Sequence, residues 1–324
     1  MKRFLLLNVI GILLGSGAFG STIPRAILSH NGVLTQYESN LWLNAFDDAA
    51  EGDIIYLTPG SFSGDLTITK AVSVIGSGIA LSDAFFSQDE LETAYGGCAS
   101  TSGSTIIAGN INIAVASSSH PTLIEGIIVP SWYGFEPSVT ISTAITNLTI
   151  RRCQFSNVFK ATATVTNIVF EQCFASWFYC DNLNSPTVRN CWFNNLCNAV
   201  NLEFTNCLIG GGYDFNTCHF INCICFEKRE HNTFTYCLTR DQTGTGNTFD
   251  EHCKIPEDWF FYRKTKAQFL EANYLGNDGT VIGPLGGPAP FTFKPSQPYV
   301  ASSALNYNAT TKKLNVTMTI NKGE

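Results

Sequence analysis

Three charged residues recur at one position of a repeated segment and could perform chemistry. Arg151, Glu171 and Arg189 each stand two positions before a cysteine. A polysaccharide lyase needs an arginine or lysine to take the α-proton of an acidic sugar, and a cluster of carboxylates that holds Ca²⁺ against it. Stacked on strands roughly 4.8 Å apart, the three side chains would instead form a solvated ion-pair ladder. The sequence favours the ladder.

A second polar group lies near the end of the repeats. Residues 227–231 include Glu230 and His231, and after two short segments the chain reaches Asp250 and His252. Two imidazoles and several carboxylates could bind a metal or catalyse a reaction if they converged. No tight ligand spacing links them, and a solvated loop at the end of the regular coils is the favoured explanation. We therefore expect neither a metal nor another cofactor, Ca²⁺ being required only by a lyase.

Two aromatic clusters are the candidate ligand-binding residues. Trp132 and Tyr133 fall in one segment, and Trp177 and Tyr179 fall in another. Sugars can stack their apolar faces on exposed rings of this kind. The alternative is that each ring packs beneath its own loop.

A repeat positions these residues. Each repeat contains one cysteine, and successive cysteines are 20, 18, 16, 16 and 14 residues apart. An apolar residue stands three positions before each of them. A unit of this length is too short to contain a helix but sufficient for one all-strand turn of a solenoid. The six cysteines are Cys153, Cys173, Cys191, Cys207, Cys223 and Cys237.

The neighbours of each cysteine form two further columns. The residue before it should occupy a turn with left-handed backbone angles, where asparagines can hydrogen-bond their copies in adjacent repeats. The residue after it should face outward as an apolar stripe, which we expect the segment 259–262 (Trp-Phe-Phe-Tyr) to cover. The first column is Arg152, Gln172, Asn190, Asn206, Asn222 and Tyr236, and the second is Gln154, Phe174, Trp192, Leu208, Ile224 and Leu238.

Most of the 12 cysteines should be reduced core residues. Stacked cysteines have parallel Cα–Cβ vectors roughly 4.8 Å apart, slightly beyond the Cβ separation of a disulfide. Cys98 and Cys253 lie outside the ladder and are expected to behave differently.

The two ends of the chain differ from the repeats. Residues 1–20 are expected to be a signal peptide, with two basic residues, an apolar run over 4–14 and a small-residue cleavage site. Residues 21–52 should hold a lead and a short capping helix carried by Leu41, Leu43, Phe46 and Ala50, with Ser39 and Asn40 as caps. Residues 53–253 should form the solenoid. Residues 254–324 should cap it, with a terminal β-hairpin over the runs 300–307 and 314–320.

The chain resembles the pectin-lyase-like superfamily at its capping helix and first coil, in residues 49–60, 66–70 and 74–78. It also resembles the end segment of secreted Bacteroidetes-type β-helix proteins, in residues 276–287. The resemblance implies an all-β fold, a right-handed parallel β-helix solenoid with a short N-terminal capping helix and a C-terminal β appendage. It does not imply one function. No histidine lies between glycines as in polygalacturonase-like hydrolases, and the segment 60–64 lacks the Tyr and Glu of pectin-esterase-like proteins.

Charge narrows the possible partners. The net charge is −7, and the 19 Lys and Arg residues are scattered, so nucleic acid is not an expected partner. No later stretch is long and apolar enough to span a membrane after signal cleavage. The sequence therefore predicts a non-catalytic scaffold, secreted or on the cell surface, with a polysaccharide or cell-surface glycan as its partner. A polysaccharide lyase on the same fold is the alternative.

Overall fold

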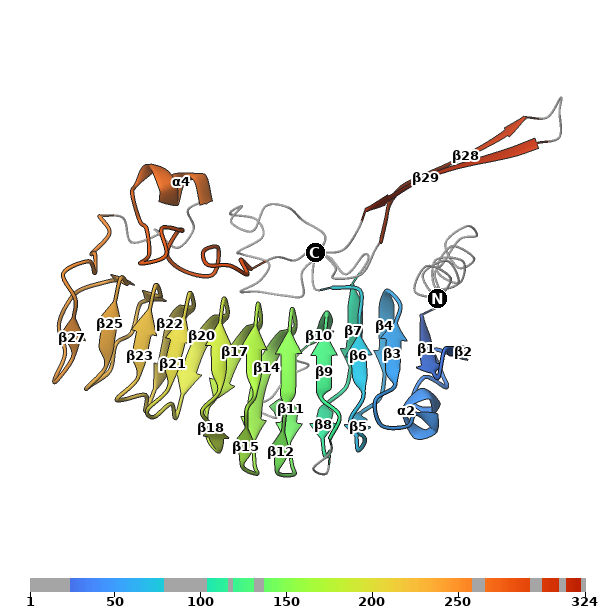
Figure 1. The fold of residues 1–324 in the computed structure, drawn as a ribbon, viewed down its shortest axis with the longest axis horizontal. Helices are drawn as coiled ribbons and strands as arrows, with labels where there is room; N and C mark the ends of the chain where they lie inside the picture. Colours follow the sequence, from blue (N-terminus) through green and yellow to red (C-terminus); the bar gives the residue numbers. More distant parts are fainter. Residues whose placement is uncertain are drawn as a thin grey trace.

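The computed structural model describes residues 24–78, 104–115, 119–130, 137–257, 266–291, 299–308 and 313–321. The expected signal peptide, Cys98, Trp132, Tyr133 and the segment 259–262 lie outside these residues. The described chain is all-β and dominated by long parallel sheets that are compatible with a β-helix (Figure 1). Within the described residues, no helix has the length and apolar character required to cross a membrane.

Two 12-stranded sheets run the length of the molecule. Sheet 1 is parallel except at its N-terminal edge, where β2 and β1 are antiparallel. In spatial order it contains β2 (Val33–Glu38), β1 (Arg25–His30), β3 (Ile54–Leu57), β6 (Ser73–Ile75), β9 (Thr122–Glu125), β13 (Leu148–Arg151), β16 (Val169–Glu171), β19 (Thr187–Arg189), β21 (Glu203–Thr205), β23 (His219–Ile221), β25 (Thr233–Thr235) and β27 (Thr248–Phe249).

Sheet 2 is parallel. Its main path contains β26 (Leu238–Thr239), β24 (Ile224–Cys225), β22 (Leu208–Tyr213), β20 (Trp192–Cys197), β17 (Phe174–Tyr179), β14 (Gln154–Ala161), β10 (Ile127–Val129), β7 (Thr105–Ala108) and β4 (Gly60–Ser63). Beside it lie β11 (Pro137–Ile141), β8 (Ile111–Ile113) and β5 (Leu66–Ile68), and a separate three-stranded sheet contains β12 (Ile145–Thr146), β15 (Val165–Thr166) and β18 (Leu183–Asn184).

The predicted register of the repeats is confirmed. Each cysteine-centred repeat gives one strand to sheet 1 and the next strand to sheet 2, so equivalent residues lie side by side. The apolar residue three positions before each cysteine is buried. Phe204, Phe220 and Phe234 stack face to face with ring centroids 5.2 Å apart. The core is therefore a continuous column between the sheets.

The cysteine column is also confirmed. All six cysteines are at most 1 % exposed, and the 11 described cysteines are free thiols. The backbone N–H of Cys207 donates to Cys223 Sγ at 3.3 Å, and Cys223 Sγ lies 3.2 Å from the carbonyl oxygen of Phe204. The expectation for Cys253 is wrong, because it continues the column and accepts a hydrogen bond from the Cys237 backbone N–H at 3.4 Å.

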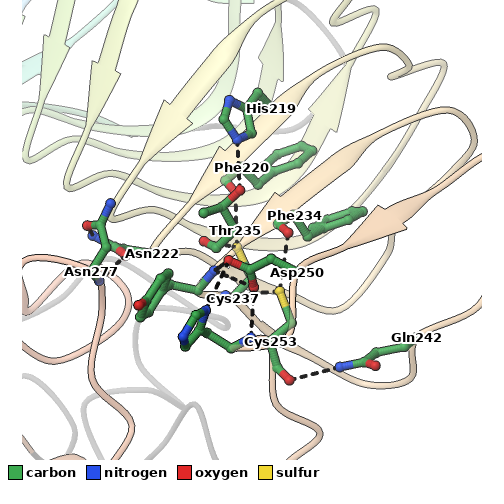
Figure 2. Close-up of polar contacts among 12 residues, drawn as sticks. His219, Phe220, Asn222, Phe234, Thr235, Cys237, Gln242, Asp250, Cys253 and Asn277 are labelled. Atoms are coloured by element: carbon green, nitrogen blue, oxygen red, sulfur yellow. Dashed lines mark hydrogen bonds and ion pairs between the residues drawn. The ribbon is translucent and has the colours of Figure 1, made fainter.

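The turn before each cysteine has the predicted left-handed backbone, with φ between 52° and 56° in all six copies. Between neighbouring copies in this column, Arg152 Nε donates to Gln172 Oε1 at 2.7 Å. Two of the three asparagines hydrogen-bond outside the column. Asn190 Nδ2 donates to the carbonyl oxygens of Pro284 and Gly286, and Asn222 exchanges hydrogen bonds with Asn277 (Figure 2).

These contacts attach a C-terminal strap, defined here as residues 266–291, to the wall of sheet 2. The strap begins with helix α4 (Lys266–Glu271) and lies beside the last repeats (Figure 1). The outward stripe is buried as predicted, with Trp192 only 2 % exposed. Among the described residues, Phe269, Val281, Ile282 and Phe291 pack against this stripe. A second hydrophobic core therefore lies outside the first.

The structure differs from the sequence prediction in the caps and the buried face of the short N-terminal helix. The short helix is α2 (Asn44–Asp48), its first residues carry no side-chain cap, and Leu41 is 51 % exposed. The buried anchor is Trp42, whose indole N–H donates to the Ser63 carbonyl at 3.0 Å. Of the residues expected on the apolar face, Phe46 is buried and Leu43 packs partly buried against the core, whereas Ala50 is exposed. Ala45 and Ala49 are buried in addition.

The hairpin of β1 and β2 was not predicted. Asn31 and Gly32 form its two-residue turn with positive φ angles of 48° and 81°. It adds two antiparallel strands to the edge of sheet 1 at β3. The C-terminal hairpin was predicted and is present as β28 (Tyr299–Asn308) paired with β29 (Lys313–Asn321). Its capping role stays a prediction.

Candidate functional site

Each arginine of the charged ladder on sheet 1 forms an ion pair with a glutamate. Arg151 Nη2 lies 2.6 Å from Glu125 Oε2, and Arg189 Nε donates to Glu171 Oε2 at 2.7 Å. The strand register places Glu125, Arg151, Glu171 and Arg189 in one row, so charges of opposite sign alternate. Both guanidinium groups are committed to carboxylates. The row has the geometry of a structural ladder and offers no free base.

Sequence reasoning missed Glu125, which is 1 % exposed and begins the row. Its repeat has Ile127 where later repeats have cysteine, so an alignment on cysteines does not extend to it. The available signal was the spacing of Ile124 and Ile127, which equals that of Ile150 and Cys153. Burial of this carboxylate costs desolvation free energy, and its ion pairs with Arg151 and Arg152 offset part of that cost.

The structure brings together only two of the candidate metal ligands, Asp250 and His252, whose Oδ2 and Nδ1 atoms lie 3.7 Å apart. Asp250 accepts hydrogen bonds from the backbone N–H groups of Tyr236 and His252, both at 3.1 Å, and lies beside Cys237 and Cys253 (Figure 2). The His252 ring stacks on Tyr236 at 4.1 Å. His231 occupies a separate left-handed turn, and Glu230 lies next to it. In the described part of the chain, no three such side chains form a group able to hold a metal ion.

Trp177 and Tyr179 lie on the outer face of β17 and form a patch with Tyr213 of β22. The ring of Tyr213 lies 6.2 Å from Trp177 and 6.1 Å from Tyr179, centroid to centroid. The Tyr213 hydroxyl donates to the Tyr179 hydroxyl at 2.5 Å, and this bond is the main cause that raises the pKa of Tyr213. Trp177 and Tyr179 are half-buried and Tyr213 is 36 % exposed. We call these three residues the aromatic patch.

Tyr213 was missed at the sequence level although a signal existed. It stands six positions after Cys207, as Tyr179 stands six positions after Cys173. The register places both in one row, with Cys197 between them. A neighbouring row contains Trp177, Asn195 and Gly211. The cysteine alignment therefore predicts the patch once it is extended along each strand.

A polar cleft of about 470 Å³ adjoins the aromatic patch, lined by residues 226–230, 240, 241 and 243–245. Lys228 is largely buried and forms an ion pair with Asp241, which lowers the pKa of that carboxyl to about 2. Arg229 Nε donates to the carbonyl oxygen of Gly212 at 3.0 Å. Because Gly212 immediately precedes Tyr213, this bond joins the cleft to the patch.

Two carboxylates in the cleft are unpaired. Neither Glu227 nor Glu230 makes a side-chain hydrogen bond or ion pair within the described residues, and both are exposed. A β-carbon at Gly211 would lie 3.7 Å from Glu227 Cγ, so Glu227 directly continues the row of Trp177, Asn195 and Gly211.

A scan against protein-family models and searches of curated proteins and solved structures found no significant match.

Proposed function

We propose that this chain is an exported right-handed parallel β-helix of the pectin-lyase-like superfamily that acts as a non-catalytic scaffold and contacts glycans. The repeated return of the chain to both sheets supports the solenoid. Trp42 and α2, which lie next to the first coil, support a helical cap. Residues 1–20 would direct export, so the mature protein would be secreted or held on the cell surface.

The observation that carries the proposal is the aromatic patch. Its three rings are presented by two strands of a long sheet, at fixed spacing, beside an open polar cleft. An indole and two phenol rings offer apolar faces for stacking on a sugar and hydroxyl groups for hydrogen bonding. Strands hold such groups more rigidly than loops do, which reduces the entropy lost on binding.

The paired ladder supports the non-catalytic half of the proposal. An arginine that takes a proton must be free to lose its own, and ion pairing with Glu125 and Glu171 favours the charged guanidinium of Arg151 and Arg189. The motifs of hydrolases and esterases on this fold are absent from the sequence. The lyase remains the competing function.

Affinity electrophoresis through gels that contain one soluble polysaccharide each tests the proposal. The wild-type protein should be retarded by at least one neutral or acidic polymer. Trp177→Ala should lower the affinity roughly tenfold or more, because the loss of a stacked ring removes on the order of 1.5 kcal/mol or more. Trp177→Phe keeps a ring and should retain most of the binding.

The lyase alternative has its own readout. The same polysaccharides are incubated with the protein, with and without Ca²⁺, and ultraviolet absorbance reports unsaturated products. No product is expected. Turnover that Arg151→Ala or Arg189→Ala abolishes would overturn the scaffold proposal in favour of a lyase.

A further inference from the structure

We infer that two copies of this chain form a dimer by pairing their β2 strands (Val33–Glu38), which joins their two copies of sheet 1 into one continuous sheet. Within the described residues, β2 pairs with β1 along one edge and with no strand along the other. β1, β2 and α2 lie together at the end of the long sheets opposite α4 (Figure 1). An open edge strand presents unpaired backbone N–H and C=O groups that a strand of another chain can bind.

Side chains of the described residues cover the neighbouring edge of sheet 2. The indole N–H of Trp42 donates to the carbonyl oxygen of Ser63 at the end of β4, at 3.0 Å. A β-carbon at Gly60 would clash with the Pro24 ring, so Pro24 packs against the start of the same strand. β2 has six residues, whereas β4, β26 and β27, which also end the long sheets, have four, two and two. β2 therefore offers the longest terminal edge of the two sheets.

β2 lacks the features by which proteins protect an edge strand. It contains neither proline nor lysine, and its register with β1 is unbroken by a bulge. Its one charged residue, Glu38, stands at the end of the strand and forms an ion pair with Arg25 of the same chain at 3.6 Å. Val33 is 65 % exposed, so strand pairing would remove apolar area from water.

The hairpin turn determines which backbone groups of β2 point outward. Residues 31–32 form a two-residue turn, so the flanking pair of His30 and Val33 exchanges hydrogen bonds across the hairpin. Every second residue of β2 then bonds to β1 in the same way. Leu34 and Gln36 are the residues between, and they direct their N–H and C=O groups away from β1.

A two-fold axis through Thr35 satisfies these outward groups. It places Leu34 opposite the partner's Gln36, and each such pair exchanges both backbone hydrogen bonds. Thr35 faces the partner's Thr35 in a non-hydrogen-bonded pair, and the exposed Val33 faces the partner's Tyr37, so their side chains are neighbours. No charged residue falls among the paired positions. The strand is therefore complementary to a second copy of itself.

A second register satisfies the same backbone groups, with the axis through Gln36. It places Glu38 opposite the partner's Leu34 and leaves Val33 beyond the paired residues. It therefore partly desolvates a carboxylate and leaves the exposed valine in water. The axis through Thr35 avoids both costs.

Analytical ultracentrifugation of the purified protein over a dilution series tests the dimer. The wild type should pass from monomer to dimer as its concentration rises. Gln36→Pro removes the outward N–H group and no bond to β1, so it should weaken the association roughly a hundredfold or more. Gln36→Thr keeps the N–H group and is the matched control, which should dimerise as the wild type does. Far-UV circular dichroism and urea unfolding check that both variants keep the fold.

Disulfide trapping tests the register without weakening the strand. Thr35→Cys should cross-link two copies under mild oxidation, because a non-hydrogen-bonded pair holds its Cα atoms about 4.5 Å apart, within disulfide range. Val33→Cys should not, because the two copies of residue 33 would lie about 14 Å apart along the strands. The wild type, whose described cysteines are buried, is the blank.

Four results would overturn the inference. The first is a wild-type protein that stays monomeric at every concentration. The second is a dimer that Gln36→Pro leaves intact, since the interface then lies elsewhere. The third is a mass that keeps rising beyond the dimer, because a two-fold interface closes. The fourth is cross-linking of Val33→Cys in place of Thr35→Cys, which excludes the register. None of these measurements depends on glycan binding, so the proposed function stands or falls separately.

Discussion

Asn190 provides the sharpest test of how the strap is held. Its side chain is 1 % exposed, and Nδ2 donates to the carbonyl oxygens of Pro284 at 3.0 Å and Gly286 at 2.7 Å. Replacement by glycine preserves the left-handed backbone at φ 52° but removes both bonds. Two lost hydrogen bonds that strand buried carbonyl groups cost about 2–4 kcal/mol. We expect Asn190→Gly to destabilise the protein by that amount.

Asn206 is the matched control. It occupies the same column with φ 53°, it is also 1 % exposed, and its Nδ2 makes no hydrogen bond. Asn206→Gly therefore carries the same backbone change without the same loss, and we expect a cost below about 1 kcal/mol. The difference between the two variants isolates the side-chain bonds to the strap.

Urea unfolding of both variants gives the two free energies, and hydrogen exchange of the backbone amides of Ile282, Gly286 and Phe291 reports local opening of the strap. These amides donate to protein carbonyls in the native state. Asn190→Gly should speed their exchange, and Asn206→Gly should not. Equal costs for the two variants would refute the view that Asn190 fastens the strap.

Three further changes test other parts of the fold. Gly212→Ala should lower the free energy of unfolding by about 2 kcal/mol or more, because φ is 138° and a β-carbon would lie 1.8 Å from the Leu196 carbonyl oxygen. Gly211→Ala is the control and should be nearly neutral. Thermal unfolding of both variants compares them. Lys70→Met should cost about 1–2 kcal/mol by urea unfolding, because the ammonium group donates to three carbonyls near the end of α2, with the exposed Lys160→Met as control. Burial raises the pKa of the Cys153, Cys191 and Cys223 thiols. The free energy of unfolding should therefore be constant below the unfolded thiol pKa of about 8.5 and fall above it by about 1.4 kcal/mol per pH unit and thiol. A urea midpoint that is unchanged up to about pH 10 would contradict this.

The features that the sequence predicted are those that repeat. The buried cysteine column, the left-handed turn and the outward stripe each recur at a fixed offset, so six copies identify the face on which each residue lies. Parallel pairing in register then follows, because a slip of one residue would expose the core. The strand content and the stripe's need for a cover were therefore predictable.

The features that were missed depend on single contacts. The identity of the strap residues follows from pairs such as Asn222 with Asn277, which are 55 positions apart and belong to no repeat. The face of α2 depends on one buried indole, Trp42, which a helical spacing of aliphatic residues conceals. The hairpin of β1 and β2 was predictable, since Asn31 and Gly32 are the residues that a two-residue turn prefers.

The site shows the same division. Arg151, Glu171 and Arg189 were placed correctly in one row, but the decisive partner Glu125 lies in a repeat without the cysteine marker. Trp177 and Tyr179 were named without Tyr213, which lies two repeats later. Neither charge pairing nor its absence at Glu227 can be deduced from residue type, because both depend on which side chain reaches which neighbour.

The residues at the two ends of β17 differ in polarity, which explains why the strap covers one part of the outer face of sheet 2 and leaves another part exposed. β17 and β20 begin with Phe174 and Trp192, which lie beneath the strap, whereas later in β17 Trp177 and Tyr179 remain partly exposed. Phe174 has no polar group, so water contact along its column would be unfavourable, and a second layer of chain stabilises it. The tyrosines of the patch carry hydroxyl groups that can contact water. An aromatic surface of this composition can stay exposed in the free protein and still bury apolar area when a sugar replaces the water.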